Sequence, residues 1–137
     1  MIDLFAGSGA MGLEAISRGA AKALFVERDR DAIAAIRANV EAMKLHEVAK
    51  LTTRDATAMG KAAEEPFDVA FLDPPYREGL GERALASLQA GGWLKPDALI
   101  VFERGADEAL AQLDGHEVLD VRRYGAASVS FLKRLLP

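Results

Sequence analysis

The sequence of 137 residues contains no cysteine and only two histidines. The lack of cysteine excludes a disulfide-stabilised scaffold, a CxxC redox pair and a zinc site built on thiolates. It is compatible with a reducing cytoplasm. His46 and His116 lie far apart in the chain, with no other histidine near either of them. We therefore expect no metal site.

The sequence also lacks a long apolar run and an excess of basic residues. No run approaches the roughly 20 apolar residues of a membrane span, and the first residues lack the basic start of a signal peptide. We therefore expect a cytoplasmic protein that does not contact a membrane. The 17 basic and 21 acidic residues give a formal net charge of −4, which argues against a general polyanion binder. Any nucleic-acid partner must be bound by a local basic patch.

Short apolar runs alternate with helical stretches along the whole chain. With 50% hydrophobic residues, there is enough apolar material for one domain that spans residues 1–137. Strand patterns occur at residues 1–5, 23–27, 50–53, 67–73, 98–103, 117–124 and 128–135. Helix patterns occur at residues 11–18, 29–45, 81–90 and 107–113. This alternation predicts an α/β fold, with a mostly parallel sheet and helices on both of its faces.

Acidic residues recur where the first four strands end. Asp3, Glu27, Asp55 and Asp73 lie in these strands or just after them. The carboxyl ends of the strands form the binding crevice of a doubly wound sheet. The sequence therefore predicts a ligand site that is rich in carboxylates.

The turn after the first strand is rich in glycine. Gly7, Gly9 and Gly12 have the spacing of the dinucleotide fingerprint, and Glu27 follows about 20 residues later. Such a turn lets a cofactor approach the backbone, while the carboxylate accepts hydrogen bonds from a ribose. The pattern fits any adenosine cofactor, including NAD.

The fourth strand ends in Asp73-Pro74-Pro75-Tyr76, a sequence that distinguishes between these cofactors. An amine on an aromatic ring is a poor nucleophile, because its lone pair is delocalised into the ring. The Asp73 carboxylate and the Pro74 carbonyl can each accept one N–H of such an amine and so orient its lone pair, while Pro75 stiffens the turn. Tyr76 would stack on a flipped base. A site that orients a planar amine in this way has a chemical use that a hydride-transfer enzyme does not share.

In these motifs the sequence resembles the class I S-adenosylmethionine-dependent methyltransferases that act on exocyclic amines. Four motifs match in order: Asp3-Leu4-Phe5-Ala6-Gly7-Ser8-Gly9, Glu27, Asp55-Ala56 and Asp73-Pro74-Pro75-Tyr76. The closer resemblance is to the bacterial 16S ribosomal RNA guanine-N2 methyltransferases of the RsmD type. It extends over residues 3–104, and its further marks are Asn39, Gly79-Leu80 and Gly92-Trp93-Leu94.

The resemblance implies a Rossmann-like fold of seven strands, with the last strand antiparallel, and S-adenosylmethionine as cofactor. Asp3 would hold the amino group of the cofactor, Glu27 its ribose hydroxyls and Asp55 its adenine amine. The implied cofactor-binding residues are Asp3, Ala6, Gly7, Gly9, Glu27, Arg28, Asp55 and Ala56. The implied catalytic residues are Asp73, Pro74, Pro75 and Tyr76.

The implied function is methylation of the N2 amine of a guanine in 16S ribosomal RNA, free or within a small-subunit assembly particle. We expect a monomeric catalytic domain without the N-terminal extension that the family usually carries. Three other activities stay open, because the tetrapeptide positions a planar amine of any origin: adenine-N6 or cytosine-N4 methylation of DNA, and methylation of a protein glutamine. A non-catalytic module that binds cofactor or RNA is the alternative from another class.

Overall fold

The computed structural model describes residues 1–75, 79–105 and 115–135. Its elements follow one another as β1 (Ile2–Leu4), α1 (Ala10–Ser17), β2 (Ala23–Val26), α2 (Arg30–Ala42), β3 (Ala49–Thr52), β4 (Phe67–Leu72), α3 (Leu80–Gly91), β5 (Leu94–Gly105), β6 (His116–Tyr124) and β7 (Ala127–Arg134). Each predicted element within these ranges has the predicted type, and the predicted helix at 107–113 lies outside the described residues. No helix of the described part is long and apolar enough to cross a membrane.

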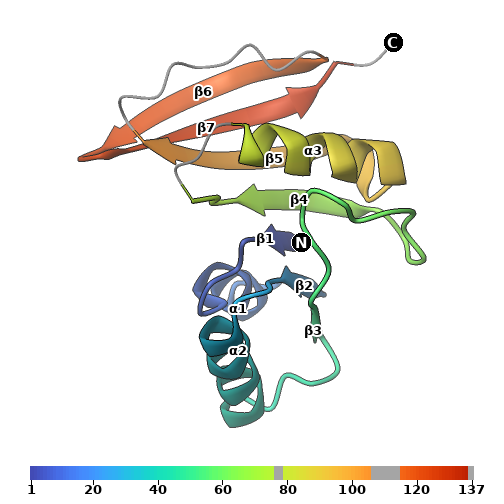
Figure 1. Ribbon diagram of the computed structural model, residues 1–137, viewed down its shortest axis with the longest axis vertical. Coiled ribbons are helices and arrows are strands. Elements are labelled where there is room, and N and C mark those ends of the chain that lie inside the picture. The colour runs from blue at the N-terminus through green and yellow to red at the C-terminus, as the bar shows by residue number, and fades with distance from the viewer. Residues whose placement is uncertain (76–78, 106–114, 136–137) are drawn as a thin grey trace.

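The seven strands form one sheet in the order β3-β2-β1-β4-β5-β7-β6, with β1 and β4 in its middle (Figure 1). Strands β1 to β5 pair in parallel, whereas β7 is antiparallel to both β5 and β6. The predicted mixed sheet with an antiparallel last strand is therefore confirmed. The carboxyl ends of β1, β2, β4 and β5 lie along one side of the sheet, which we call the carboxyl edge.

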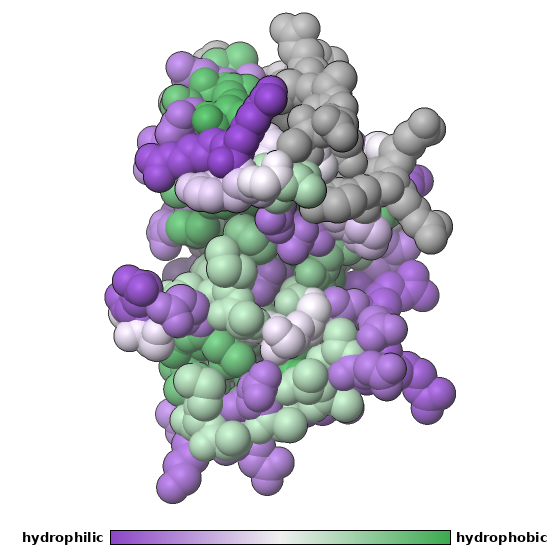
Figure 2. All heavy atoms as spheres, turned by 90° about the vertical axis from the view of Figure 1, so that its left-hand side faces the viewer, coloured by the Kyte–Doolittle hydropathy of each residue, from purple (hydrophilic) through white to green (hydrophobic). Residues whose placement is uncertain are grey.

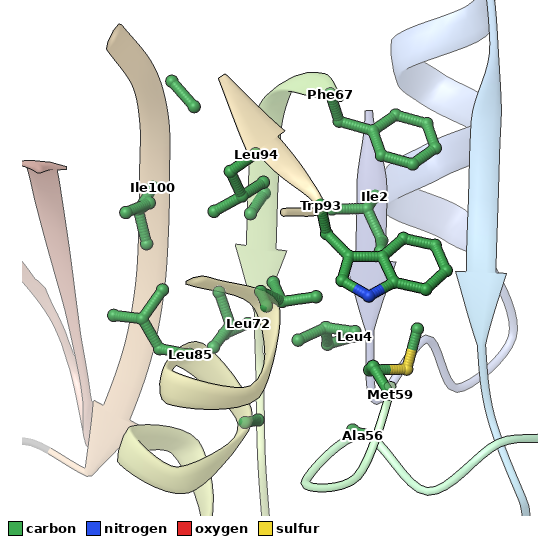
Figure 3. Packing of buried hydrophobic residues seen from close by; sticks show 14 of the residues in the cluster. Ile2, Leu4, Ala56, Met59, Phe67, Leu72, Leu85, Trp93, Leu94 and Ile100 are labelled. Carbon is green, nitrogen blue, oxygen red and sulfur yellow. The ribbon is translucent and has the colours of Figure 1, made fainter. Parts of the chain in front are cut away.

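Helix α3 covers one face of the sheet. Alternate side chains of β1, β4 and β5 point to this face because side chains alternate along a strand. Figure 3 shows the Trp93 indole among Ile2, Leu4 and Met59 in this core. The indole nitrogen donates a hydrogen bond to the Gly60 carbonyl at 2.8 Å. Trp93 is therefore a core residue, and it also fixes the connection between β3 and β4, which contains no helix.

Helices α1 and α2 cover the other face, where they pack on β2. Phe25 is fully buried there and lies in one cluster with Leu13, Ile36 and Val40. Gly12 lies so close to β2 that a Cβ atom at this position would be 2.3 Å from Cε1 of Phe25. The third glycine of the fingerprint therefore allows close contact between helix and strand.

Two boundaries differ from the predicted ones by more than two residues. Helix α2 ends at Ala42 instead of residue 45, because Lys44 adopts a left-handed conformation with φ of 55° and the Leu45 N–H bonds back to the Val40 carbonyl. Leu45 still packs on the core. The helical spacing of apolar residues in the sequence therefore extends beyond the end of the helix. Strand β5 begins at Leu94 instead of residue 98, and a register shift in its pairing with β4 accommodates Pro96.

We expect Gly12→Ala to lower the free energy of unfolding by about 1–3 kcal/mol, because the new methyl group overlaps the Phe25 ring. Chemical denaturation measures this loss. Phe25→Leu provides the control, since a smaller side chain makes room for the methyl group. The double variant should lose less stability than the sum of the two single variants. Additive losses would contradict the proposed contact.

Candidate functional site

A cavity of about 510 Å³ opens at the carboxyl edge. Five residues that the sequence singled out line it together: Gly7, Glu27, Asp73, Pro74 and Pro75. They come from the ends of β1, β2 and β4, three neighbouring strands. Tyr76 lies outside the described residues. The parallel sheet thus gathers residues that are far apart in the sequence into one hollow.

The backbone of the glycine turn after β1 is held in an uncommon conformation. Phe5 and Gly7 both have positive φ, at 60° and 59°. This region is unfavourable for a bulky residue such as Phe5, and residues of this kind cluster at binding sites. Asn39 of α2 supports the turn through a 3.2 Å hydrogen bond from its Nδ2 to the Ser8 carbonyl. The turn exposes backbone along the cavity and leaves open space at the Gly7 Cα.

Glu27 links this turn to the loop after β2. Its Oε1 accepts a 2.8 Å hydrogen bond from the Gly7 N–H, and its Oε2 accepts bonds of 2.9 and 3.0 Å from the N–H groups of Arg28 and Asp29. A carboxylate can accept about four hydrogen bonds, so one acceptor position remains. The carboxylate is therefore fixed in place and can still receive a hydroxyl group of a ligand.

Asp3 lies in the middle of the sheet and is 1% exposed. Its Oδ2 has no hydrogen-bond partner among the described residues. Burial raises the pKa of Asp3 to about 7; the Gly12 N–H opposes this rise, and the charges of Asp73 and Glu27 add to it. A cation beside Oδ2 would give this oxygen the partner that it lacks.

Asp73 shares the site with Glu103, which the sequence analysis did not single out. Because Leu72 pairs with Phe102, the next residues of β4 and β5 lie side by side. Desolvation raises the pKa of Asp73 to about 7, and a hydrogen bond with Glu103 and the charge of that residue contribute to the rise. Asp73 can therefore hold a proton near neutral pH, in a hydrogen bond with Glu103. Glu103 could have been found from the sequence, because it ends a predicted strand as Asp73 does.

Neither Asp55 nor Ala56 lines the cavity: Asp55 is exposed, and Ala56 is buried in the core under α3. The Asp55 carboxylate accepts hydrogen bonds from the backbone and the hydroxyl of Thr57, and these bonds lower its pKa. Arg28 reaches Asp55 in an exposed ion pair of 3.5 Å, and so connects the ends of β2 and β3. The structure thus brings the predicted adenine-binding residues next to Glu27, but it does not bring them into the same hollow. Ala6 and Gly9 belong to the glycine turn.

The charge of the cavity distinguishes between the two predicted cofactors. Its lining includes Glu27, Asp29 and Asp73, and no lysine or arginine from the part of the chain that the structure describes. The pyrophosphate of NAD would meet only like charge here. S-adenosylmethionine instead carries an ammonium and a sulfonium group, which suit Asp3 and its acidic neighbours. The donor and acceptor set therefore fits S-adenosylmethionine better than NAD.

Comparisons with known proteins match residues 1–133 to a family described as Conserved hypothetical protein 95. The chain is similar to ribosomal RNA small subunit methyltransferase D from Haemophilus influenzae, with 35% identity over 130 residues that cover 93% of this chain and 67% of that protein. For the protein of the same name from Escherichia coli K12, the identity is 38% over 109 residues, which cover 80% of this chain and 54% of that protein. The chain thus spans between about half and two thirds of these relatives.

Solved structures show the same likeness in three dimensions. A putative methyltransferase from Escherichia coli superposes with a TM-score of 0.87 at 31% identity, over 99% of this chain and 77% of that chain. A putative methylase from Haemophilus influenzae superposes with a TM-score of 0.85 at 34% identity, over 98% of this chain and 86% of that chain.

We expect the raised pKa of Asp3 to make the chain less stable at pH 8 than at pH 6. Below its native pKa of about 7 the folded chain keeps a proton that the unfolded chain has already lost, since the ordinary value is 3.8. Ionisation of Asp3 should therefore lower the free energy of unfolding by about 1 kcal/mol as the pH rises from 6 to 8, in addition to the fall that Asp73 causes over the same range. Chemical denaturation at the two pH values measures the difference.

Asp3→Asn is the control, because asparagine keeps an acceptor for the Gly12 N–H and cannot ionise. The free energy of unfolding should fall less between pH 6 and pH 8 in this variant than in the parent chain. The difference between the two falls should equal the contribution of Asp3. Equal pH dependence in the two chains would show that Asp3 does not titrate in this range.

Proposed function

The chain belongs to the family described as Conserved hypothetical protein 95, and from this premise we propose that it methylates ribosomal RNA with S-adenosylmethionine. Its motifs predicted this family and the class I methyltransferase fold, and both predictions are confirmed. The finer proposal is that the acceptor is the N2 amine of a guanine in 16S ribosomal RNA. A ribosomal RNA acceptor would make the protein cytoplasmic.

One observation carries the proposal. The Gly7 turn, the Glu27 carboxylate and the Asp73-Pro74 pair line one acidic cavity, and the buried Asp3 lies on the strand between the last two. Two relatives named as ribosomal RNA methyltransferases support the choice of substrate. The choice of an exocyclic amine as the methyl acceptor is supported by Asp73 and Pro74, which can each accept one of its N–H groups.

In this proposal Asp3 and Glu27 bind the cofactor. The free acceptor position of Glu27 would receive a ribose hydroxyl, and the unpartnered oxygen of Asp3 would receive the ammonium group. The Gly7 backbone would lie alongside, since no side chain fills that space. The bound cofactor supplies a methyl group on a positively charged sulfur. Asp55 and the backbone of Ala56 would hold the adenine, since the Ala56 side chain is buried in the core.

Asp73 and Pro74 act on the amine. The Asp73 carboxylate and the Pro74 carbonyl each accept an N–H, which directs the nitrogen lone pair away from them. Positive charge would develop on the nitrogen as it takes up the methyl group, and the Asp73 carboxylate would stabilise that charge. The nitrogen then loses one proton. Asp73 can accept that proton, because its pKa is raised to about 7.

We expect S-adenosylmethionine to raise the melting temperature of the chain, and NAD to leave it unchanged, because only a ligand that binds the native state stabilises it. Glu27→Gln should weaken the binding of S-adenosylmethionine by about tenfold or more, since a charge-assisted hydrogen bond is lost. Calorimetric titration measures the dissociation constant. Glutamine retains an acceptor for the Gly7 N–H, so the turn should keep its shape.

Glu47→Gln is the matched control, because Glu47 is exposed and precedes β3 at the opposite edge of the sheet. It should bind S-adenosylmethionine as the parent chain does. A melting temperature that rises with NAD and not with S-adenosylmethionine would contradict the proposed site. Equal losses of affinity for S-adenosylmethionine in the Glu27 and Glu47 variants would contradict it as well.

We expect Asp73→Ala to lower the rate of methyl transfer by at least about a hundredfold, while the dissociation constant of the cofactor changes little. The contact from Asp73 to the amine strengthens as charge develops, so its loss affects the transition state more than cofactor binding. The measurement is transfer of a radioactive methyl group to 16S ribosomal RNA and to assembled small subunits, with DNA as a competing acceptor.

Asp97→Ala is the control, because Asp97 is an exposed acid that lies toward the start of β5. It should methylate at the parent rate. A parent chain that binds the cofactor without any turnover would contradict catalysis and favour the non-catalytic module. Transfer to DNA alone would contradict the proposed substrate.

A further inference from the structure

The turn between β6 and β7 lies at the carboxyl edge, although these strands come last in the chain. Strand β7 runs antiparallel to β5, and Ala127 pairs with both Gly105 and Tyr124. The end of the hairpin is therefore level with the end of β5, whose Glu103 contacts Asp73. Figure 1 shows the turn projecting on the same side as the tips of β1 and β4. The turn and the cavity thus face the same region of solvent.

The strand register also aligns individual side chains across this edge. Glu103 pairs with Val129, and Val129 pairs with Arg122, so one row of the sheet leads from Asp73 to Arg122. Residues directly opposite each other in a sheet have side chains on the same face. Tyr124 lies two residues beyond Arg122 and shares that face. The row crosses three strand spacings, so Arg122 lies roughly 14 Å from Asp73.

The side chains at the end of the hairpin are exposed and held in place. Tyr124 is 60% exposed, the largest value among the exposed large hydrophobic side chains of the described residues. The Arg122 side chain is 61% exposed, and its Nε donates a 3.1 Å hydrogen bond to Asp120. Its guanidinium also lies over the Phe131 ring at 5.6 Å. Hydrogen bonds with Asp120 and Tyr124 raise the pKa of Arg122, so the two exposed side chains support one another.

The charge of the hairpin is opposite to that of the cavity. Toward the turn between β6 and β7 lie two basic residues, Arg122 and Arg123, and one acidic residue, Asp120, in a chain whose net charge is −4. Near the top of Figure 2, which faces the carboxyl edge, strongly hydrophilic side chains lie beside strongly hydrophobic ones. The cavity is lined by Glu27, Asp29 and Asp73 and would repel phosphate groups. A polyanion whose reacting group enters the cavity must therefore be held from beside it.

We propose that Arg122 and Tyr124 form a surface that binds single-stranded RNA next to the nucleotide in the cavity. Tyr124 stacks on a base, and the remaining N–H groups of Arg122 bind a backbone phosphate. A separation of roughly 14 Å from Asp73 leaves room for the target nucleotide and its neighbours. This surface supplies the local basic patch that an acidic chain needs to bind RNA. The inference rests on the proposed function and adds to it the place where the substrate strand lies.

The test is RNA binding by fluorescence anisotropy, with a labelled and unstructured oligoribonucleotide as the probe. We expect Tyr124→Ala to weaken binding by about tenfold, because stacking on one base is lost. Arg122→Gln keeps a donor for Asp120 and removes the charge. It should weaken binding several-fold and lower the slope of log affinity against log salt by about one.

Arg134→Ala is the matched control, because Arg134 is an exposed arginine of the same hairpin that pairs with His116 at the opposite edge of the sheet. It should bind RNA almost as the parent chain does. Parent affinity in the Tyr124 and Arg122 variants would overturn the inference, and so would a parent chain that fails to bind the probe. Tighter binding of DNA of the same sequence would overturn the assignment to RNA.

Titration with S-adenosylmethionine separates this inference from the proposed function. Arg122 and Tyr124 do not line the cavity, so both variants should bind the cofactor with the parent dissociation constant. Loss of cofactor binding in the parent chain would contradict the proposed function itself. Normal cofactor binding with unchanged RNA binding in the variants would contradict only the hairpin surface.

Discussion

The parallel alignment of β2, β1 and β4 forces three carboxyl groups to share one edge of the sheet. Asp3, Glu27 and Asp73 could not approach each other if any of these strands ran the other way. Desolvation is the main cause of the raised pKa of Asp3, and the charges of Asp73 and Glu27 add to it, so holding these groups together costs free energy. The carboxylate of Glu27 offsets part of this cost through three backbone hydrogen bonds. A cationic ligand would offset the remaining free-energy cost of these carboxyl groups. The fold is thus arranged for ligand binding at the expense of its own stability.

The sequence predicted the elements and the first four strand ends because these depend on local patterns. Apolar runs marked the buried strands, and the glycines and prolines marked where they stop. Glu103 ends a predicted strand and could have been noticed, but its place beside Asp73 follows only from the pairing of β4 with β5. The alignment of Arg122 with Asp73 was out of reach for the same reason, since it follows from three successive strand pairings. The register of strand pairing decides which side chains from distant parts of the sequence lie together, and local sequence patterns do not reveal that register.

The site residues divide between two kinds of surface with different chemistry. The cavity at β1, β2 and β4 is acidic and suits a cofactor with positive charge, whereas the hairpin of β6 and β7 carries exposed arginine and tyrosine side chains. Asp73 and Glu103 lie between them, on β4 and β5. In our proposal the methyl donor approaches from one side and the RNA from the other. The central strands would then bring the amine and the methyl group together.

Nucleoside mass spectrometry of 16S ribosomal RNA tests the central claim most directly. The comparison is between the organism that carries this gene and a strain in which the gene is deleted. Our account predicts that one N2-methylguanosine disappears on deletion and returns with the parent gene, but not with a gene that encodes Asp73→Ala. An unchanged content of N2-methylguanosine in the 16S ribosomal RNA of the deletion strain would contradict the account.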